Sequence, residues 1–114
     1  MFDLEGRTLE YGKRIIVLCR ALTQKQEVIN KRLVDQLIRS GTSVGANYRE
    51  ANETETKKDF KFKIRIALKE AKETEYWIAL VSDANPDLSA RMQPLVGETR
   101  ELIKILAAIL EKSK

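Results

Sequence analysis

Apolar residues recur at intervals of three and four residues through almost the whole chain. This spacing places them on one side of an α-helix, whereas a half-buried strand would alternate apolar and polar residues, and no stretch of useful length does so. Four segments carry the helical pattern, at roughly residues 8–23, 30–53, 56–83 and 92–110. The sequence therefore predicts an all-α protein, built as an up-down-up-down four-helix bundle with long antiparallel helices.

The predicted core consists of the residues on the inner side of each helix. In chain order these are Leu9, Ile15, Ile16, Cys19, Leu22, Leu33, Leu37, Ser40, Val44, Tyr48, Ala51, Phe60, Ile64, Ala67, Ala71, Ile78, Met92, Leu95, Val96, Thr99, Leu102, Ile103, Leu106, Ile109 and Leu110. Thr56 followed by Asp59 resembles a capping arrangement, so we expect the third helix to begin there. Pro86 is expected to end that helix, and Asp87 or Ser89 to cap the fourth.

The length of 114 residues fits a single domain, residues 1–114, with one modest core. The first residues are acidic where a signal peptide would be basic and then apolar, and no apolar stretch is long enough to span a membrane. We therefore expect a cytoplasmic protein without a membrane partner. Cys19 is the single cysteine, and its apolar surroundings favour a buried, inert thiol over a reactive one.

The chain contains no histidine. This excludes Ser-His and Cys-His catalysis as well as zinc sites with imidazole ligands. Carboxylates remain as acid–base groups, but Glu70, Glu73 and Glu75 are spaced too closely to share one side of a helix as a set. We expect no enzymatic activity, no cofactor and no metal.

Residues 40–52, SGTSVGANYREAN, contain two glycines within a helical pattern. A phosphate-binding P-loop would need G-x-x-x-x-G-K-[ST] after a strand, whereas Gly45 is followed by Ala46 and Asn47. Each glycine costs a helix about 1 kcal/mol relative to alanine, so Gly41 and Gly45 predict the close approach of a neighbouring helix. Asn47 projects near Ser40 and Ser43, where a hydrogen bond between helices is favoured over a ligand contact.

Basic residues form a ridge along the third predicted helix. A rotation of about 100° per residue places the six on one continuous sector: Lys57, Lys58, Lys61, Arg65, Lys69 and Lys72. Seven basic and two acidic residues between positions 57 and 72 give a net charge of +5, against +4 for the whole chain. This basic ridge is suited to neutralising the phosphates of RNA or DNA without reading sequence, although a charge-rich helix is also typical of a solvated surface.

The same projection groups Phe62, Ile66, Trp77 and Leu80 on another side of this helix, away from its core residues. A single bundle does not easily bury two apolar sides of one helix. We therefore interpret these four residues as an oligomer interface, with partial cover by the first helix or the N-terminal segment as the alternative.

The segments TSVGANYREA and KKDFKFKIRIALKEAKETEYWIAL resemble the four-helix-bundle proteins named after the 23S ribosomal RNA intervening sequence. In that family an S-[IV]-x-x-N-x-x-E-[AG] motif precedes a K-x-F helix that ends near E-x-x-x-W. The first motif corresponds to Ser43, Val44, Asn47, Glu50 and Ala51. The second corresponds to Asp59, Phe60, Lys69, Glu70, Ala71, Glu73, Thr74, Glu75 and Trp77. Many members carry an aromatic-Pro pair before the second helix, where this chain has QEVIN.

This resemblance implies a bundle that assembles into a ring, commonly a homopentamer, with the motif residues as packing and assembly determinants. It also implies kinship with the accessory bundle proteins of diversity-generating retroelements, which work with reverse transcriptase and nucleic acid. Two functions are therefore expected: a nucleic-acid-binding accessory protein, whose partner is RNA, DNA or a nucleic-acid-processing protein, or a purely structural oligomeric adaptor. A carboxylate-based enzyme is the weakest alternative.

Overall fold

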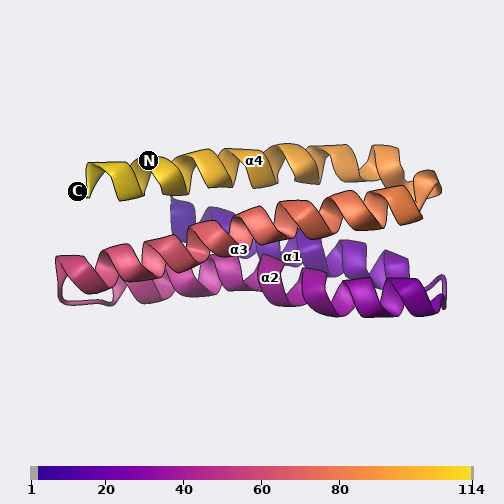
Figure 1. The fold of residues 1–114 in the computed structure, drawn as a ribbon, viewed down its shortest axis with the longest axis horizontal. Helices are drawn as coiled ribbons and strands as arrows, with labels where there is room; N and C mark the ends of the chain where they lie inside the picture. Colours follow the sequence, from indigo (N-terminus) through magenta and orange to yellow (C-terminus); the bar gives the residue numbers. More distant parts are fainter. Residues whose placement is uncertain (1–2, 114) are drawn as a thin grey trace.

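Four long antiparallel helices make up the structure, a computed structural model that describes residues 3–113 (Figure 1). They are α1 (Leu4–Thr23), α2 (Val28–Asn52), α3 (Lys57–Ala84) and α4 (Ser89–Lys112), with the short 3₁₀ helix η1 (Pro86–Leu88) between the last two. The four-helix bundle predicted from the sequence is confirmed. Its elongated shape, 45 × 22 × 20 Å, gives each helix one inner side and one long outer side.

Side-chain caps explain where two of the four long helices begin. Thr56 caps α3 as predicted, because its Oγ1 accepts a hydrogen bond from the Asp59 backbone N–H at 3.1 Å. Asp3 caps α1 in the same way, so α1 begins at Leu4, four residues earlier than predicted. The predicted cap of the fourth helix is wrong. η1 runs directly into α4, and no side chain accepts a hydrogen bond at its N-cap position.

The predicted core is confirmed except on α1, where Leu9 is 51% exposed and Ile16 is 37% exposed. The apolar residues of this helix cover two neighbouring sides, and only one of them can face the bundle. The inner side carries Tyr11 and Leu18 in addition to the predicted Ile15 and Leu22. Cys19 is buried as expected, and burial raises the pKa of its thiol to about 11.

The glycines of α2 allow α1 to pack closely against it. A Cβ atom added to Gly41 would lie 2.8 Å from Cγ1 of Ile15, and one added to Gly45 would lie 3.1 Å from Cβ of Thr8. We call this contact the glycine seam. Because α2 is a single helix through both glycines, this segment forms no phosphate-binding loop.

Polar side chains join the other side of α1 to α4. Arg7 donates two hydrogen bonds of 2.7 Å to the two carboxylate oxygens of Glu98. These bonds hold the pKa of Glu98 below its usual value. The buried hydroxyls of Tyr11 and Thr99 lie 2.6 Å apart, and burial raises the pKa of the Tyr11 phenol.

A pair of buried asparagine side chains closes one end of the bundle. Asn30 of α2 and Asn85, which follows α3, exchange two amide hydrogen bonds of 2.9 Å each. Asn85 also donates to the backbone carbonyl of Val81, and Lys25 donates to Oδ1 of Asn85 at 2.7 Å. Lys25 in turn binds Asp87 at 2.8 Å, so Asp87 serves an ion pair instead of the predicted cap.

Candidate nucleic-acid interface

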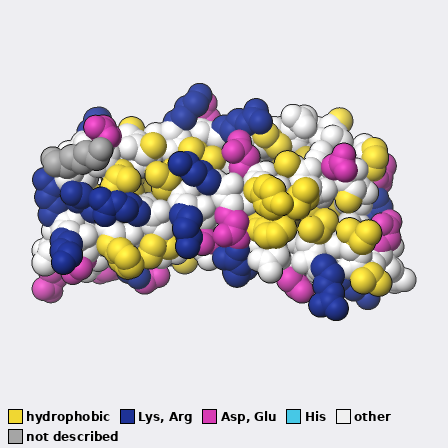
Figure 2. Space-filling view, viewed as in Figure 1, with side chains coloured by type: hydrophobic (Ala, Val, Ile, Leu, Met, Phe, Trp, Pro, Cys, Tyr) yellow, Lys and Arg dark blue, Asp and Glu magenta, His cyan; other side chains and the backbone are white. Residues whose placement is uncertain are grey.

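The basic ridge follows the outer side of the first half of α3. Its members are Lys57, Lys58, Lys61, Arg65, Lys69 and Lys72, and all are exposed except Lys61, which is half-buried. Figure 2 shows Lys and Arg side chains over the half of the visible face where α3 begins. The structure thus brings together the side chains that the sequence grouped on one sector.

Within residues 3–113, none of the six ridge side chains forms an ion pair or a hydrogen bond. The other charged residues in the middle of α3 behave differently. Lys63 binds Glu50 of α2 at 2.9 Å, and Glu75 binds Arg100 of α4 at 2.9 Å. The paired charges therefore join α3 to its neighbours, while the ridge leaves six positive charges without a carboxylate partner.

The start of α3 adds to the positive field of the ridge. Lys57 and Lys58 are the first two residues of the helix, where unpaired backbone N–H groups already carry partial positive charge. Basic residues are unfavourable at this end of a helix, and only Asp59 supplies an acidic side chain in the first turn. An anion at this end of the bundle would contact both the lysines and the positive end of the helix dipole.

The four residues predicted as an oligomer interface form a partly exposed apolar strip beside the ridge. Phe62 is 57% exposed and Leu80 is 36% exposed, while Ile66 and Trp77 are half-buried. The alternative, partial cover by α1 or the N-terminal segment, is not met by α1, which leaves both side chains exposed, and the first two residues of that segment lie outside the described residues. We call these four residues the apolar strip, and Figure 2 shows hydrophobic side chains gathered near the middle of the same face.

An ion-pair cluster lies next to the apolar strip. Arg39 of α2 donates a hydrogen bond of 3.0 Å to the buried Glu70 and also contacts Glu73. Trp77 donates its indole N–H to Glu73 at 3.0 Å. Sequence reasoning missed Arg39. The signal that pointed to it was Glu70, since a carboxylate close to the core side of a helix needs a cation from a neighbouring helix.

The motif residues of α2 have packing roles and lie apart from the ridge. Gly41 and Gly45 form the glycine seam, and Glu50 joins α2 to α3 through Lys63. Asn47 donates to the backbone carbonyl of Ser43 within its own helix, so the predicted hydrogen bond between helices is wrong at this position. Ser40 makes such a bond instead, because its hydroxyl accepts from Thr74 of α3 at 2.9 Å.

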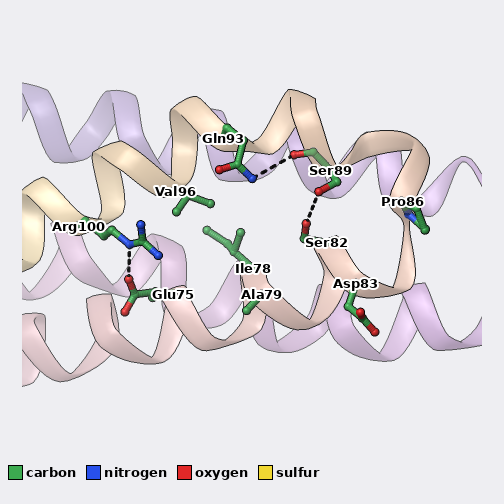
Figure 3. Close-up of a pocket in the computed structure, with 10 residues that line it drawn as sticks. All are labelled: Glu75, Ile78, Ala79, Ser82, Asp83, Pro86, Ser89, Gln93, Val96 and Arg100. Atoms are coloured by element: carbon green, nitrogen blue, oxygen red, sulfur yellow. Dashed lines mark hydrogen bonds and ion pairs between the residues drawn. The ribbon is translucent and has the colours of Figure 1, made fainter.

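A groove lies between α3 and α4 next to η1 and has a volume of about 690 Å³ (Figure 3). Its polar groups bind one another: Glu75 pairs with Arg100, the hydroxyls of Ser82 and Ser89 lie 2.9 Å apart, and Gln93 donates to the Ser89 carbonyl. These partnerships leave few groups to recognise a ligand.

Two further classes of site are absent from the part of the chain that the structure describes. No group of three or more Cys, Asp or Glu side chains is placed to hold a metal ion within residues 3–113. None of the described helices combines the length and the apolar character that a bilayer crossing requires.

Known proteins place this architecture in a family. A family model described as 23S rRNA-intervening sequence protein matches residues 6–108. The chain is also similar to a crystal structure, at 1.70 Å resolution, of a protein with unknown function from the S23 ribosomal protein family of Bacteroides thetaiotaomicron VPI-5482. The two are 35% identical with a TM-score of 0.86, and the similarity covers 95% of this chain and 98% of the other. Among curated proteins, none matches. With four matching helices and a family model that spans nearly its whole length, this chain belongs to the 23S rRNA-intervening sequence protein family.

Proposed function

We propose that this protein is a non-enzymatic, oligomeric helical bundle that binds nucleic acid through the basic ridge of α3. One observation carries the proposal: the six ridge cations have no carboxylate partner among residues 3–113, although Lys63, Glu70 and Glu75 of the same helix are all paired. Phosphates would neutralise these charges and release counterions, which gives an affinity that depends on salt and not on sequence.

Self-association is the second part of the proposal, with a ring of five copies as the form that the family resemblance implies. The exposed Phe62 and Leu80 support it, because large apolar side chains left open to solvent within residues 3–113 are typical of protein interfaces. A ring would bring several copies of the ridge together, so weak phosphate contacts would add through a high effective concentration. We place this assembly in the cytoplasm, without a cofactor.

A salt titration of binding to generic RNA and DNA tests the ridge, with polyglutamate as a control polyanion. The variant Lys61→Gln/Arg65→Gln/Lys69→Gln should weaken binding to all sequences alike. It should also flatten the slope of log affinity against log salt, since each phosphate contact contributes about −0.9 on duplex DNA and −0.7 on single strands.

A matched control removes three positive charges elsewhere. Lys31, Arg32 and Lys104 are exposed and lie on α2 and α4, away from the ridge. Their replacement by Gln gives the same net charge as the ridge variant. Equal weakening by both variants would mean that net charge alone drives binding, and unchanged affinity in the ridge variant would overturn the proposal.

A purely structural oligomeric adaptor is the second candidate, and the exposed apolar strip favours it. The adaptor function would be favoured if the unmodified protein bound neither RNA nor DNA at low salt, where charges are least screened. The ridge would then face solvent, another subunit or a nucleic-acid-processing protein.

Phe62→Lys with Ile66→Glu tests the assembly shared by both candidates, since sedimentation should give a smaller mass while circular dichroism stays helical. If the unmodified protein already sediments as a monomer, self-association through the apolar strip is wrong.

A further inference from the structure

An exposed aromatic side chain lies in line with the basic ridge. Tyr76 follows Lys69 by seven residues and Lys72 by four, so the three side chains lie above one another on the same side of α3. Tyr76 is 58% exposed, and its hydroxyl makes no hydrogen bond within residues 3–113. Sequence reasoning missed this residue, although its spacing from Lys69 and Lys72 was visible.

The Tyr76 ring packs against the ring of Trp77. Its ring meets that of Trp77 edge to face, with centroids 5.2 Å apart and planes at 68°. Trp77 is in turn held by its hydrogen bond to Glu73, which binds Arg39 of α2. The ring therefore combines exposure with contacts that limit its movement.

Glu73 and Glu75 flank Tyr76 around the helix, and each pairs with an arginine of another helix. Glu73 contacts Arg39, and Glu75 binds Arg100 at 2.9 Å. Figure 3 shows the ion pair between Glu75 and Arg100 as a dashed line. The next acidic residue on the ridge side is Asp83, two turns beyond Tyr76. An anionic strand that follows the ridge would thus meet Tyr76 before it meets an unpaired carboxylate.

We infer that Tyr76 is a base-stacking platform at the end of the basic ridge, and that the ligand of this surface is a single-stranded polynucleotide. The inference rests on the proposed function and deepens it. Bases in a duplex are stacked on one another, whereas an unpaired strand can place a base on an exposed aromatic ring while cations contact its phosphates. Such a site accepts any base, because every base has a π-face.

The test compares strands of equal charge with and without bases. The probes are an oligo(dT) and an oligo(rU) of about twelve nucleotides, the abasic strand of the same length, and the matching duplex.

The unmodified protein should bind both base-containing strands more tightly than the abasic strand. Tyr76→Ala should weaken binding to oligo(dT) and oligo(rU) by about 5-fold to 100-fold and leave abasic binding unchanged. Tyr76→Phe, which keeps the ring, should bind as the unmodified protein does. The oligo(dT) and oligo(rU) arms distinguish DNA from RNA.

A second readout needs no variant. Trp77 is the single tryptophan of the chain and touches the Tyr76 ring, so its fluorescence should change when oligo(dT) binds but not when the abasic strand binds. Sedimentation of each variant checks that Tyr76→Ala leaves the assembly intact.

The outcomes separate the two proposals. Equal affinity of the unmodified protein for the abasic strand and oligo(dT), with no fluorescence difference, would overturn the stacking inference and leave the phosphate-binding ridge standing. Binding of none of the four probes at low salt would overturn the proposed function itself.

Discussion

The glycine seam and the basic ridge place side chains on their helices in opposite ways. At the seam, Gly41 and Gly45 lack side chains, and Ile15 and Thr8 of α1 fill the space. On the ridge, long side chains of like charge lie beside one another and form no ion pair with the residues that the structure describes. Lys57, Lys61, Arg65 and Lys69 follow at intervals of four, and each such pair destabilises a helix by about 0.2–0.5 kcal/mol.

This difference separates residues that serve the fold from residues that need another explanation. Packing within one chain accounts for the seam, because the glycines permit a close contact that an added side chain would crowd. No hydrogen bond or ion pair within residues 3–113 accounts for the ridge, whose neighbouring like charges disfavour the helix that carries them. A surface that costs stability in the isolated chain is a candidate for binding.

The largest effect is expected at the seam. Gly45→Leu should lower the free energy of unfolding by about 3 kcal/mol, because the new side chain would overlap Thr8. Gly97→Leu is the control, since a Cβ atom at Gly97 on α4 meets nothing within 4 Å. That change should be neutral or stabilising by up to about 0.8 kcal/mol. Urea denaturation followed by circular dichroism measures both, and a Gly45→Leu value within about 0.5 kcal/mol of the unmodified protein would contradict close packing.

A smaller effect is expected on the opposite side of α1, where Glu98 binds Arg7. Because the pKa of Glu98 is lower in the folded state than its usual 4.5, its ionised form stabilises the fold above that pH. This contribution is lost as the pH falls through the lowered value. Glu98→Gln should therefore cost about 1 kcal/mol at neutral pH and make the acid-induced loss of stability shallower. Parallel acid profiles for the two proteins would show that the pair contributes nothing.

The smallest effect, with the opposite sign, is expected on the ridge. Lys61→Gln/Arg65→Gln/Lys69→Gln should raise the free energy of unfolding by about 0.6 kcal/mol at low salt, because it removes repulsion between neighbouring turns. The gain should vanish at high salt, where that repulsion is screened. Thermal melts at two salt concentrations measure it. A loss of stability at low salt would mean that the ridge takes part in packing after all.

The number and order of the helices could be predicted because each helix repeats its apolar spacing over many turns. The inner side of α1 could not, since the apolar residues around Ile15 and Ile16 offer two adjacent sides. The choice between them depends on the position of α2 and α4. Burial of Tyr11 similarly depends on Thr99, which is far away in the sequence.

The candidate site was predictable to a similar degree. Spacing along one helix was enough to group the six ridge residues. Their lack of partners was not predictable, because Arg39 and Arg100, which bind the neighbouring glutamates, come from α2 and α4. Tyr76 was not predicted, because its exposure and its ring contact with Trp77 depend on the folded structure.

The asparagine pair at the end of the bundle also affects arrangements that the chain does not adopt. Helices with regular apolar sides can slide along one another by a turn and still bury much of the same surface. Such a slip of α2 against α3 would separate Asn30 from Asn85 and strand amide groups away from water, at about 1–3 kcal/mol for each unmet hydrogen bond. The pair thus widens the energy gap between the native alignment and its slipped competitors, and the folding landscape keeps a single deep minimum.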